Sequence, residues 1–149
     1  MELLKNPILL VFAIGTMAIS CAEPSDPSDG FVPGINPTSS IEGIWNSVNY
    51  DFSQKNLVNQ QIDSVFSFTG PILIEYYKGN GEYHRKFLGF TEIHGYERIA
   101  DRINIFQGTD TIQAKIITLS PTHFAYTIER NVVINDSTRF QFTSAQLQR

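Results

Sequence analysis

The chain has 149 residues, with 11 Lys and Arg against 15 Asp and Glu, so its formal net charge at pH 7 is −4. This balance gives no reason to expect a nucleic-acid partner, because such binding is dominated by contacts between cations and phosphates. The sequence contains one cysteine, so an internal disulfide is excluded and the fold must depend on its core. Eleven Phe, six Tyr and one Trp supply enough apolar bulk for one domain.

The first twenty residues have the pattern of a signal peptide. A start with one cation, Lys5, precedes an apolar run over residues 8–19, which is too short to cross a bilayer as a helix. The run ends in Ala18-Ile19-Ser20-Cys21, with small residues three positions and one position before the cysteine. We predict that residues 1–20 are a lipoprotein signal peptide, cleaved before Cys21.

The segment around Cys21 resembles the lipobox of bacterial lipoproteins, with Ala18 in the place usually taken by Leu. In that family the thiol of the cysteine carries diacylglycerol. The resemblance therefore implies that Cys21 is an acylated N-terminus, with palmitate among its acyl groups, in an outer membrane lipoprotein of a bacterial cell envelope. Several acyl chains on one residue give stable attachment to a membrane without a spanning helix. An ordinary cleaved signal followed by an unmodified cysteine is the alternative.

Residues 21–40 are predicted to form a lipid-anchored flexible linker. Pro, Gly, Ser and Asp dominate this segment, which cannot bury enough apolar surface to offset the entropy lost on ordering. Its acids Glu23, Asp26 and Asp29 resemble the acidic export tag of Bacteroidota surface lipoproteins. A solvated linker explains the same acids equally well, so the sequence leaves open whether the domain faces the periplasm or the cell surface.

From residue 41 onward apolar and polar residues alternate with a period of two, which is typical of half-buried strands. Turn residues such as Lys78-Gly79-Asn80-Gly81 and Asn135-Asp136 separate the alternating segments. The His94-Gly95 pair is interpreted as a further reversal. We predict strands over residues 41–52, 62–69, 72–78, 82–93, 96–100, 103–107, 110–118 and 123–132, with 137–144 as a candidate ninth.

The predicted strands follow one another without crossover helices, so hairpins connect them and the sheet is antiparallel. Closing such a sheet into a barrel removes its exposed edges. The sequence therefore predicts an all-β domain over residues 41–149, a single antiparallel meander closed into a small eight-stranded barrel. The interior of a barrel of this size is filled by side chains or holds one small ligand.

The first predicted strand opens with Glu42-Gly43-Ile44-Trp45-Asn46, which resembles the Gly-x-Trp signature of lipocalins and of the shorter lipocalin-like lipoproteins of Bacteroidota. In that family the glycine allows close approach of the backbone. The tryptophan closes one end of the barrel, often against a late arginine. The resemblance implies a lipocalin-like barrel in which Gly43 and Trp45 take these structural roles, with Arg139 as a candidate for the arginine.

The lipocalin-like reading favours non-catalytic binding of a small apolar ligand inside the barrel, and strand parity selects the residues of its walls. These are Phe66, Phe68, Tyr76, Phe90, Ile112, Phe124, Tyr126, Phe140 and Phe142. The alternative is a filled barrel that acts as an envelope accessory and docks a protein or glycan partner through its loops.

The sequence offers little catalytic or metal-binding chemistry. His84, His94 and His123 have no metal-ligand spacing, although His84 and His94 share strand parity with Glu92. Motifs for a nucleophile or for phosphate binding are missing from the sequence. We therefore predict no cofactor, no metal and no enzymatic activity. A pair of strand-borne glutamates inside the barrel is the weaker, enzymatic alternative.

Three tripeptides begin with Asp followed by a hydroxyl residue: Asp63-Ser64-Val65, Asp110-Thr111-Ile112 and Asp136-Ser137-Thr138. They resemble the O-glycosylation tripeptide of exported Bacteroidota proteins, which implies glycans on Ser64, Thr111 and Ser137. Asp-Ser and Asp-Thr are also common in turns that lead into strands, so the tripeptides have a purely structural explanation as well.

Overall fold

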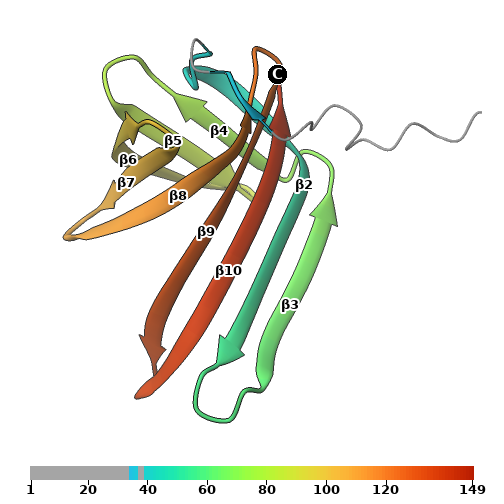
Figure 1. The fold of residues 1–149 in the computed structure, drawn as a ribbon, viewed down its shortest axis with the longest axis vertical. Helices are drawn as coiled ribbons and strands as arrows, with labels where there is room; N and C mark the ends of the chain where they lie inside the picture. The colour runs from blue at the N-terminus through green and yellow to red at the C-terminus, as the bar shows by residue number, and fades with distance from the viewer. Residues whose placement is uncertain (1–33, 37–38) are drawn as a thin grey trace, which may run out of the picture.

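The computed structural model describes residues 34–36 and 39–149. The regular secondary structure of these residues consists of β-strands alone (Figure 1). In chain order the strands are β1 (Gly34–Ile35), β2 (Gly43–Asn56), β3 (Ile62–Thr69), β4 (Leu73–Tyr77), β5 (Glu82–Phe87), β6 (Phe90–Ile99), β7 (Arg102–Gln107), β8 (Asp110–Leu119), β9 (His123–Ile134) and β10 (Ser137–Gln148). The described part of the chain contains no helix long and apolar enough to cross a membrane.

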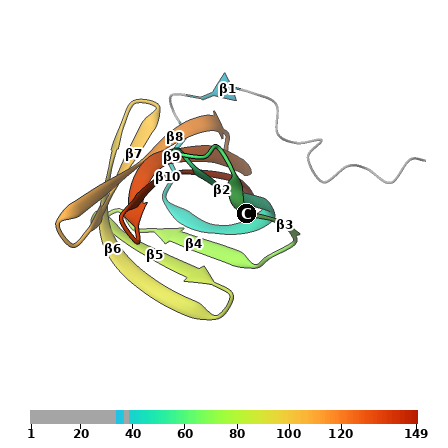
Figure 2. The same ribbon diagram turned by 90° about the horizontal axis from the view of Figure 1, so that it is seen from below.

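Eight of the described strands, β2 and β4 to β10, close into a barrel (Figure 2). Strands β4 to β10 pair antiparallel in chain order, and β2 joins β10 back to β4. The predicted all-β fold, an antiparallel meander closed into an eight-stranded barrel, is confirmed. The short β1 pairs parallel with β8 through Gly34 and Ile35, which lie within the range predicted as linker.

The barrel is closed at one end and open at the other. β2 pairs with β4 over residues 43–46 and with β3 over residues 49–55. β8 runs beside β9 from the closed end as far as the pair Ala114–Ile128, beyond which the two strands separate. The far parts of β2, β3, β9 and β10 therefore project beyond the open end as a four-stranded sheet (Figure 1). We call residues 51–56, 62–68, 129–134 and 137–143 the extended sheet.

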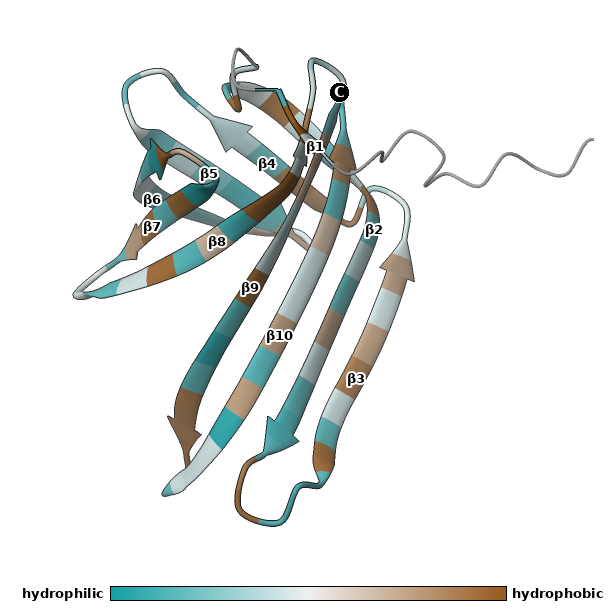
Figure 3. Cartoon of the chain, in the orientation of Figure 1, coloured by the Kyte–Doolittle hydropathy of each residue, from teal (hydrophilic) through white to brown (hydrophobic). Residues whose placement is uncertain are grey.

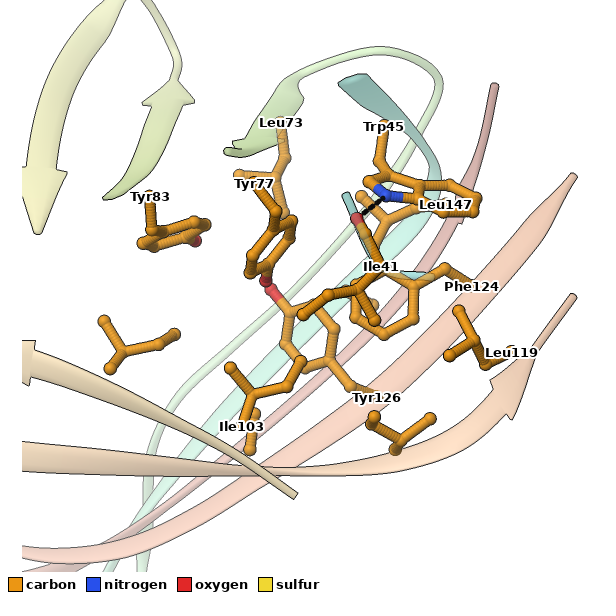
Figure 4. Close-up of a cluster of buried hydrophobic side chains, with 14 of the residues drawn as sticks. Ile41, Trp45, Leu73, Tyr77, Tyr83, Ile103, Leu119, Phe124, Tyr126 and Leu147 are labelled. Atoms are coloured by element: carbon orange, nitrogen blue, oxygen red, sulfur yellow. Dashed lines mark hydrogen bonds between the residues drawn. The ribbon is translucent and has the colours of Figure 1, made fainter. Parts of the chain in front are cut away.

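The core fills the closed end of the barrel (Figure 4). Trp45, Leu73, Phe124 and Leu147 are fully buried there. The ring of Phe124 lies 5.4 Å from that of Trp45 and 5.9 Å from that of Tyr77, measured between centroids. Burying a large apolar side chain contributes about 1.5–3 kcal/mol, so this end holds much of the stability of the domain.

The residue that covers Trp45 is Arg149, whose guanidinium carbon lies 4.2 Å from the centroid of the indole. The prediction that Arg139 packs against Trp45 is wrong. Its side chain lies on the extended sheet, where its Nε donates to Asp63 at 2.5 Å. Arg139 pairs with Asn56 at the far end of β2, and this register keeps it away from Trp45.

Two predicted strand boundaries are wrong. The predicted strand 82–93 is two strands, because Leu88 and Gly89 have φ angles of 48° and 91° and form a two-residue turn between Phe87 and Phe90. The predicted reversal at His94-Gly95 is also wrong, since β6 runs through it to Ile99. The other strands were predicted from the alternation of polar and apolar residues, which is visible along the barrel in Figure 3.

Candidate ligand cavity

A cavity of about 290 Å³ lies at the open end of the barrel. This volume is just below the range of about 300–1,000 Å³ that is common for small-molecule sites. Its apolar and aromatic walls are formed by Tyr50, Phe52, Phe66, Tyr83, Phe87, Ile105, Ile112, Tyr126 and Ile128. Its polar and charged walls are formed by Arg85, Glu92, His94, Gln107, Arg130 and Thr143.

One wall is a row of aromatic rings contributed by β2, β3 and β5. Phe66 stacks on Phe52 with 4.8 Å between ring centroids. Tyr50 lies 5.0 Å from Phe87 and 6.4 Å from Phe66. The register explains this arrangement, because Phe52 and Phe66 are direct cross-strand partners and alternate residues of both strands point the same way. The row gives the cavity an apolar surface that suits an apolar molecule.

Arg85 on β5 brings a positive charge to the cavity. Its Nη2 donates to the hydroxyl of Tyr50 at 3.3 Å, and its guanidinium lies over the ring of Phe87 at 5.2 Å. The carboxylate of Glu92 is 3.8 Å from Nη1, which is beyond hydrogen-bond distance. Arg85 is therefore a partly exposed cation at the edge of an aromatic wall.

A buried carboxyl lies among the cavity's tyrosines. Glu75 is fully buried and accepts hydrogen bonds from the hydroxyls of Tyr83 at 2.6 Å, Tyr126 at 2.7 Å and Tyr77 at 3.1 Å. Burial raises the pKa of Glu75, and the hydrogen bonds from Tyr83 and Tyr126 and the charge of Arg85 offset only part of that rise. The phenols thus satisfy a polar group that would otherwise be costly in the core.

The sequence analysis did not place Glu75 in the core. A signal for its burial was present, because Leu73, Glu75 and Tyr77 alternate on one face of β4 and all three are buried. A glutamate flanked at i−2 and i+2 by large apolar residues lies on the core face of its strand.

Of the wall residues predicted from parity, the structure brings Phe66, Ile112 and Tyr126 together around the cavity. Phe68 is half-buried beside Phe66, with 5.6 Å between their ring centroids. Phe124 faces the barrel interior but belongs to the packed core at the closed end.

The other predicted wall residues lie elsewhere. The inward orientation predicted for Tyr76 is wrong, since its neighbours Glu75 and Tyr77 point inward and Tyr76 lies on the outer surface. The inward orientation predicted for Phe140 and Phe142 is also wrong. Thr143 on the same strand faces the cavity, so the rings of Phe140 and Phe142 lie on the outer face of the extended sheet. Phe90 follows the hairpin turn and is 78% exposed.

The histidines do not converge. His84 lies beside the outward ring of Tyr76 and contacts Glu82, whereas His94 faces the cavity with its Nε2 3.6 Å from Glu92. Across the described residues, no group of three or more His, Cys, Asp or Glu side chains is placed to hold a metal ion.

The three Asp-hydroxyl tripeptides each follow a hairpin turn. Ser64 is exposed on β3, Thr111 is exposed on β8, and Ser137 is half-buried at the start of β10. The predicted lipid-attachment residue, Cys21, and the predicted signal peptide lie outside the described residues.

Comparison of the chain with protein-family models, with curated protein sequences and with solved structures returned no match. The functional assignment therefore depends on the chemistry of the cavity. Its aromatic wall and single half-buried arginine suit the binding of a small molecule with an apolar body.

Proposed function

We propose that the protein is a lipid-anchored, lipocalin-like lipoprotein of a bacterial cell envelope, and that its barrel binds a small molecule with an apolar body without catalysing a reaction. The observation that carries this proposal is the cavity at the open end, with Phe52, Phe66 and Phe87 on one wall. Transfer of an apolar ligand from water onto such a wall is favourable by about 25 cal/mol per Å² of apolar surface buried.

The position of β1 suits a tether. β1 pairs with β8 at Thr118 and Leu119, beside the packed core, whereas the cavity opens at the other end of the barrel. A lipid at Cys21, reached through the segment that precedes β1, leaves the cavity mouth clear for exchange of ligand. Membrane attachment is tested with Cys21→Ser, which should move the chain from the membrane fraction to the soluble fraction; a variant that stays membrane-bound would contradict the anchor.

Native mass spectrometry of the full chain, purified from its host envelope, tests the binding function. We expect a retained small molecule on the wild-type chain. The variant Ile112→Trp fills the cavity and should lose it. Ile117→Trp, on the exposed face of the same strand, is the matched control and should keep it. A wild-type chain that carries no small molecule would contradict the proposal.

A docking module is the second candidate function, and the outer face of the extended sheet favours it. Val65 and Val133 are 66% and 73% exposed there, on the same face as Phe140 and Phe142. Exposed apolar surface of this kind is common at protein contacts. If this face binds an envelope protein, Val65→Lys should abolish co-purification of that partner and leave the cavity ligand in place.

The tripeptide hydroxyls at Ser64, Thr111 and Ser137 are proposed sites of O-linked glycans. The same mass spectra test them, because each used site adds the mass of a glycan that the corresponding alanine variant lacks. A wild-type mass equal to that of the acylated polypeptide would exclude glycosylation at all three positions.

A further inference from the structure

We propose that the ligand of the cavity is an anionic amphiphile, a molecule with one carboxylate and an apolar body, and that Arg85 binds its carboxylate. This inference rests on the proposed binding function and names the chemical class of the ligand. It comes from the hydrogen-bond donors of Arg85 and from the charges around them.

The guanidinium of Arg85 has more donors than its protein partners use. A guanidinium carries five N–H donors in a fixed plane. Within the described residues, the hydrogen bond found for Arg85 is the long one of 3.3 Å to Tyr50. No nitrogen of Arg85 is both buried and without a partner, and 28% of its side chain is exposed. The remaining donors are therefore open to the cavity.

The negative groups near Arg85 leave room for a further anion. Glu75 is held on the core side by three phenols and has no open face. Glu92 is 47% exposed and its nearest oxygen is 3.8 Å from the guanidinium, so their attraction is weakened by solvent. Arg130 adds a second cation to the walls, with its Nε bound to Gln141 at 2.9 Å. A carboxylate that enters the cavity meets two arginines against one exposed glutamate.

The geometry places the carboxylate and the apolar body side by side. The planar fork of an arginine matches the two oxygens of a carboxylate. Arg85 lies over the ring of Phe87, and Phe87 continues through Tyr50 to the stacked pair of Phe52 and Phe66. A molecule held at Arg85 by its carboxylate can therefore lay its apolar body along these rings. The cavity volume of about 290 Å³ suits a body the size of one aromatic ring with a short chain.

Equilibrium dialysis of the full chain in lipid nanodiscs tests the inference, with protein-free nanodiscs as the blank. The probes are 3-phenylpropionate and its uncharged match, 3-phenylpropan-1-ol. We expect the acid to bind at least about tenfold more tightly than the alcohol, because hydrogen bonds between charged groups are the stronger kind. Arg85→Lys should reduce this preference, and Arg85→Met should abolish it. Glu92→Gln should tighten binding of the acid and leave the alcohol unchanged.

Arg130→Gln removes the second cation of the cavity and tests for a non-specific attraction between anions and the mouth. It should lower the preference for the acid less than Arg85→Met does, because Arg130 is exposed and its Nε already donates to Gln141. The emission of Trp45 verifies that each variant keeps its fold, since this residue lies in the packed core and does not line the cavity. Equal binding of acid and alcohol by the wild-type chain would overturn the inference. So would a preference that Arg85→Lys leaves intact and Arg130→Gln removes. If neither probe binds while native mass spectrometry finds a neutral ligand, the inference that the ligand carries a carboxylate is wrong and the binding function stands.

Discussion

The guanidinium carbon of Arg149 lies over the indole of Trp45, 4.2 Å from the ring centroid. The same group donates from Nη1 to the carbonyl of Glu42 and from Nε to the carbonyl of Pro121, both at 2.6 Å. One side chain after the last strand therefore joins the start of β2 to the turn between β8 and β9. The indole beneath is fully buried, and its Nε1 donates to the carbonyl of Ile41 at 2.7 Å (Figure 4).

Replacing Arg149 with alanine should uncover the indole and loosen the closed end. Trp45 is the only tryptophan in the chain, so the emission reports on the surroundings of this one residue. We expect a red shift of the emission and a loss of about 1–3 kcal/mol of unfolding free energy, from the cation–π contact and the carbonyl hydrogen bonds. Arg149→Lys should have an emission maximum and an unfolding free energy between those of Arg149→Ala and wild type, because lysine keeps the charge but loses the planar fork. An unshifted emission in Arg149→Ala would contradict this role.

Gly43 should resist substitution for two separable reasons. Its φ angle is 117°, and a Cβ built there would lie 2.8 Å from Nη1 of Arg149. Gly43→Ala should therefore add backbone strain of about 1–2 kcal/mol and also displace Arg149 from Trp45. Gly70→Ala is the matched control, since Gly70 has a φ angle of 105° with open space around it. In urea unfolding, Gly43→Ala should lose more stability than Gly70→Ala and should alone shift the tryptophan emission; equal losses would contradict the contact.

The barrel could be predicted because a period of two and the turn residues are local signals. They correctly separated most of the strands, and Gly43 and Trp45 were singled out by the resemblance to the Gly-x-Trp signature. Arg149 was missed because it follows the last strand, where alternation carries no information. The register of β10 on β2 decides which arginine reaches the indole, and it pairs Gln148 with Asn46 but Arg139 with Asn56. Sequence spacing alone does not fix that register.

The cavity walls were predicted only in part for a related reason. Alternation shows which residues of a strand share a face, but it does not say which face is inside. On β3 the choice of Phe66 was correct. On β10 both faces of the extended sheet carry bulky or polar residues of similar exposure, and Phe140 and Phe142 were assigned to the wrong one. Arg85 and Glu75 were missed because the walls were selected from aromatic and aliphatic residues alone.

The burial of Glu75 should give the domain a stability that falls as pH rises. The pKa of Glu75 is raised above its ordinary value of 4.5 in the folded chain, so the folded state holds the proton more tightly than the unfolded state. Its contribution is fully present below 4.5 and is lost as pH rises through the folded pKa. Glu75→Gln removes this titration. As pH rises from 4.5 through the folded pKa of Glu75, the unfolding free energy of wild type should therefore fall relative to that of Glu75→Gln. Glu129→Gln, an exposed glutamate on β9, should follow wild type; parallel curves for Glu75→Gln would contradict the assignment.

The tyrosines around Glu75 should differ in importance according to their distance from the carboxyl. The hydroxyl of Tyr126 is 2.7 Å from Oε1, whereas that of Tyr77 is 3.1 Å from Oε2. Hydrogen bonds to a charged acceptor contribute about 1.5–3 kcal/mol and weaken with distance. Tyr126→Phe should therefore destabilise the domain more than Tyr77→Phe when Glu75 is ionised, and the difference should shrink once Glu75 is protonated. Urea unfolding of both variants on either side of the Glu75 titration measures this. A larger loss in Tyr77→Phe, or a difference independent of pH, would show that the phenols do not act by stabilising the carboxylate.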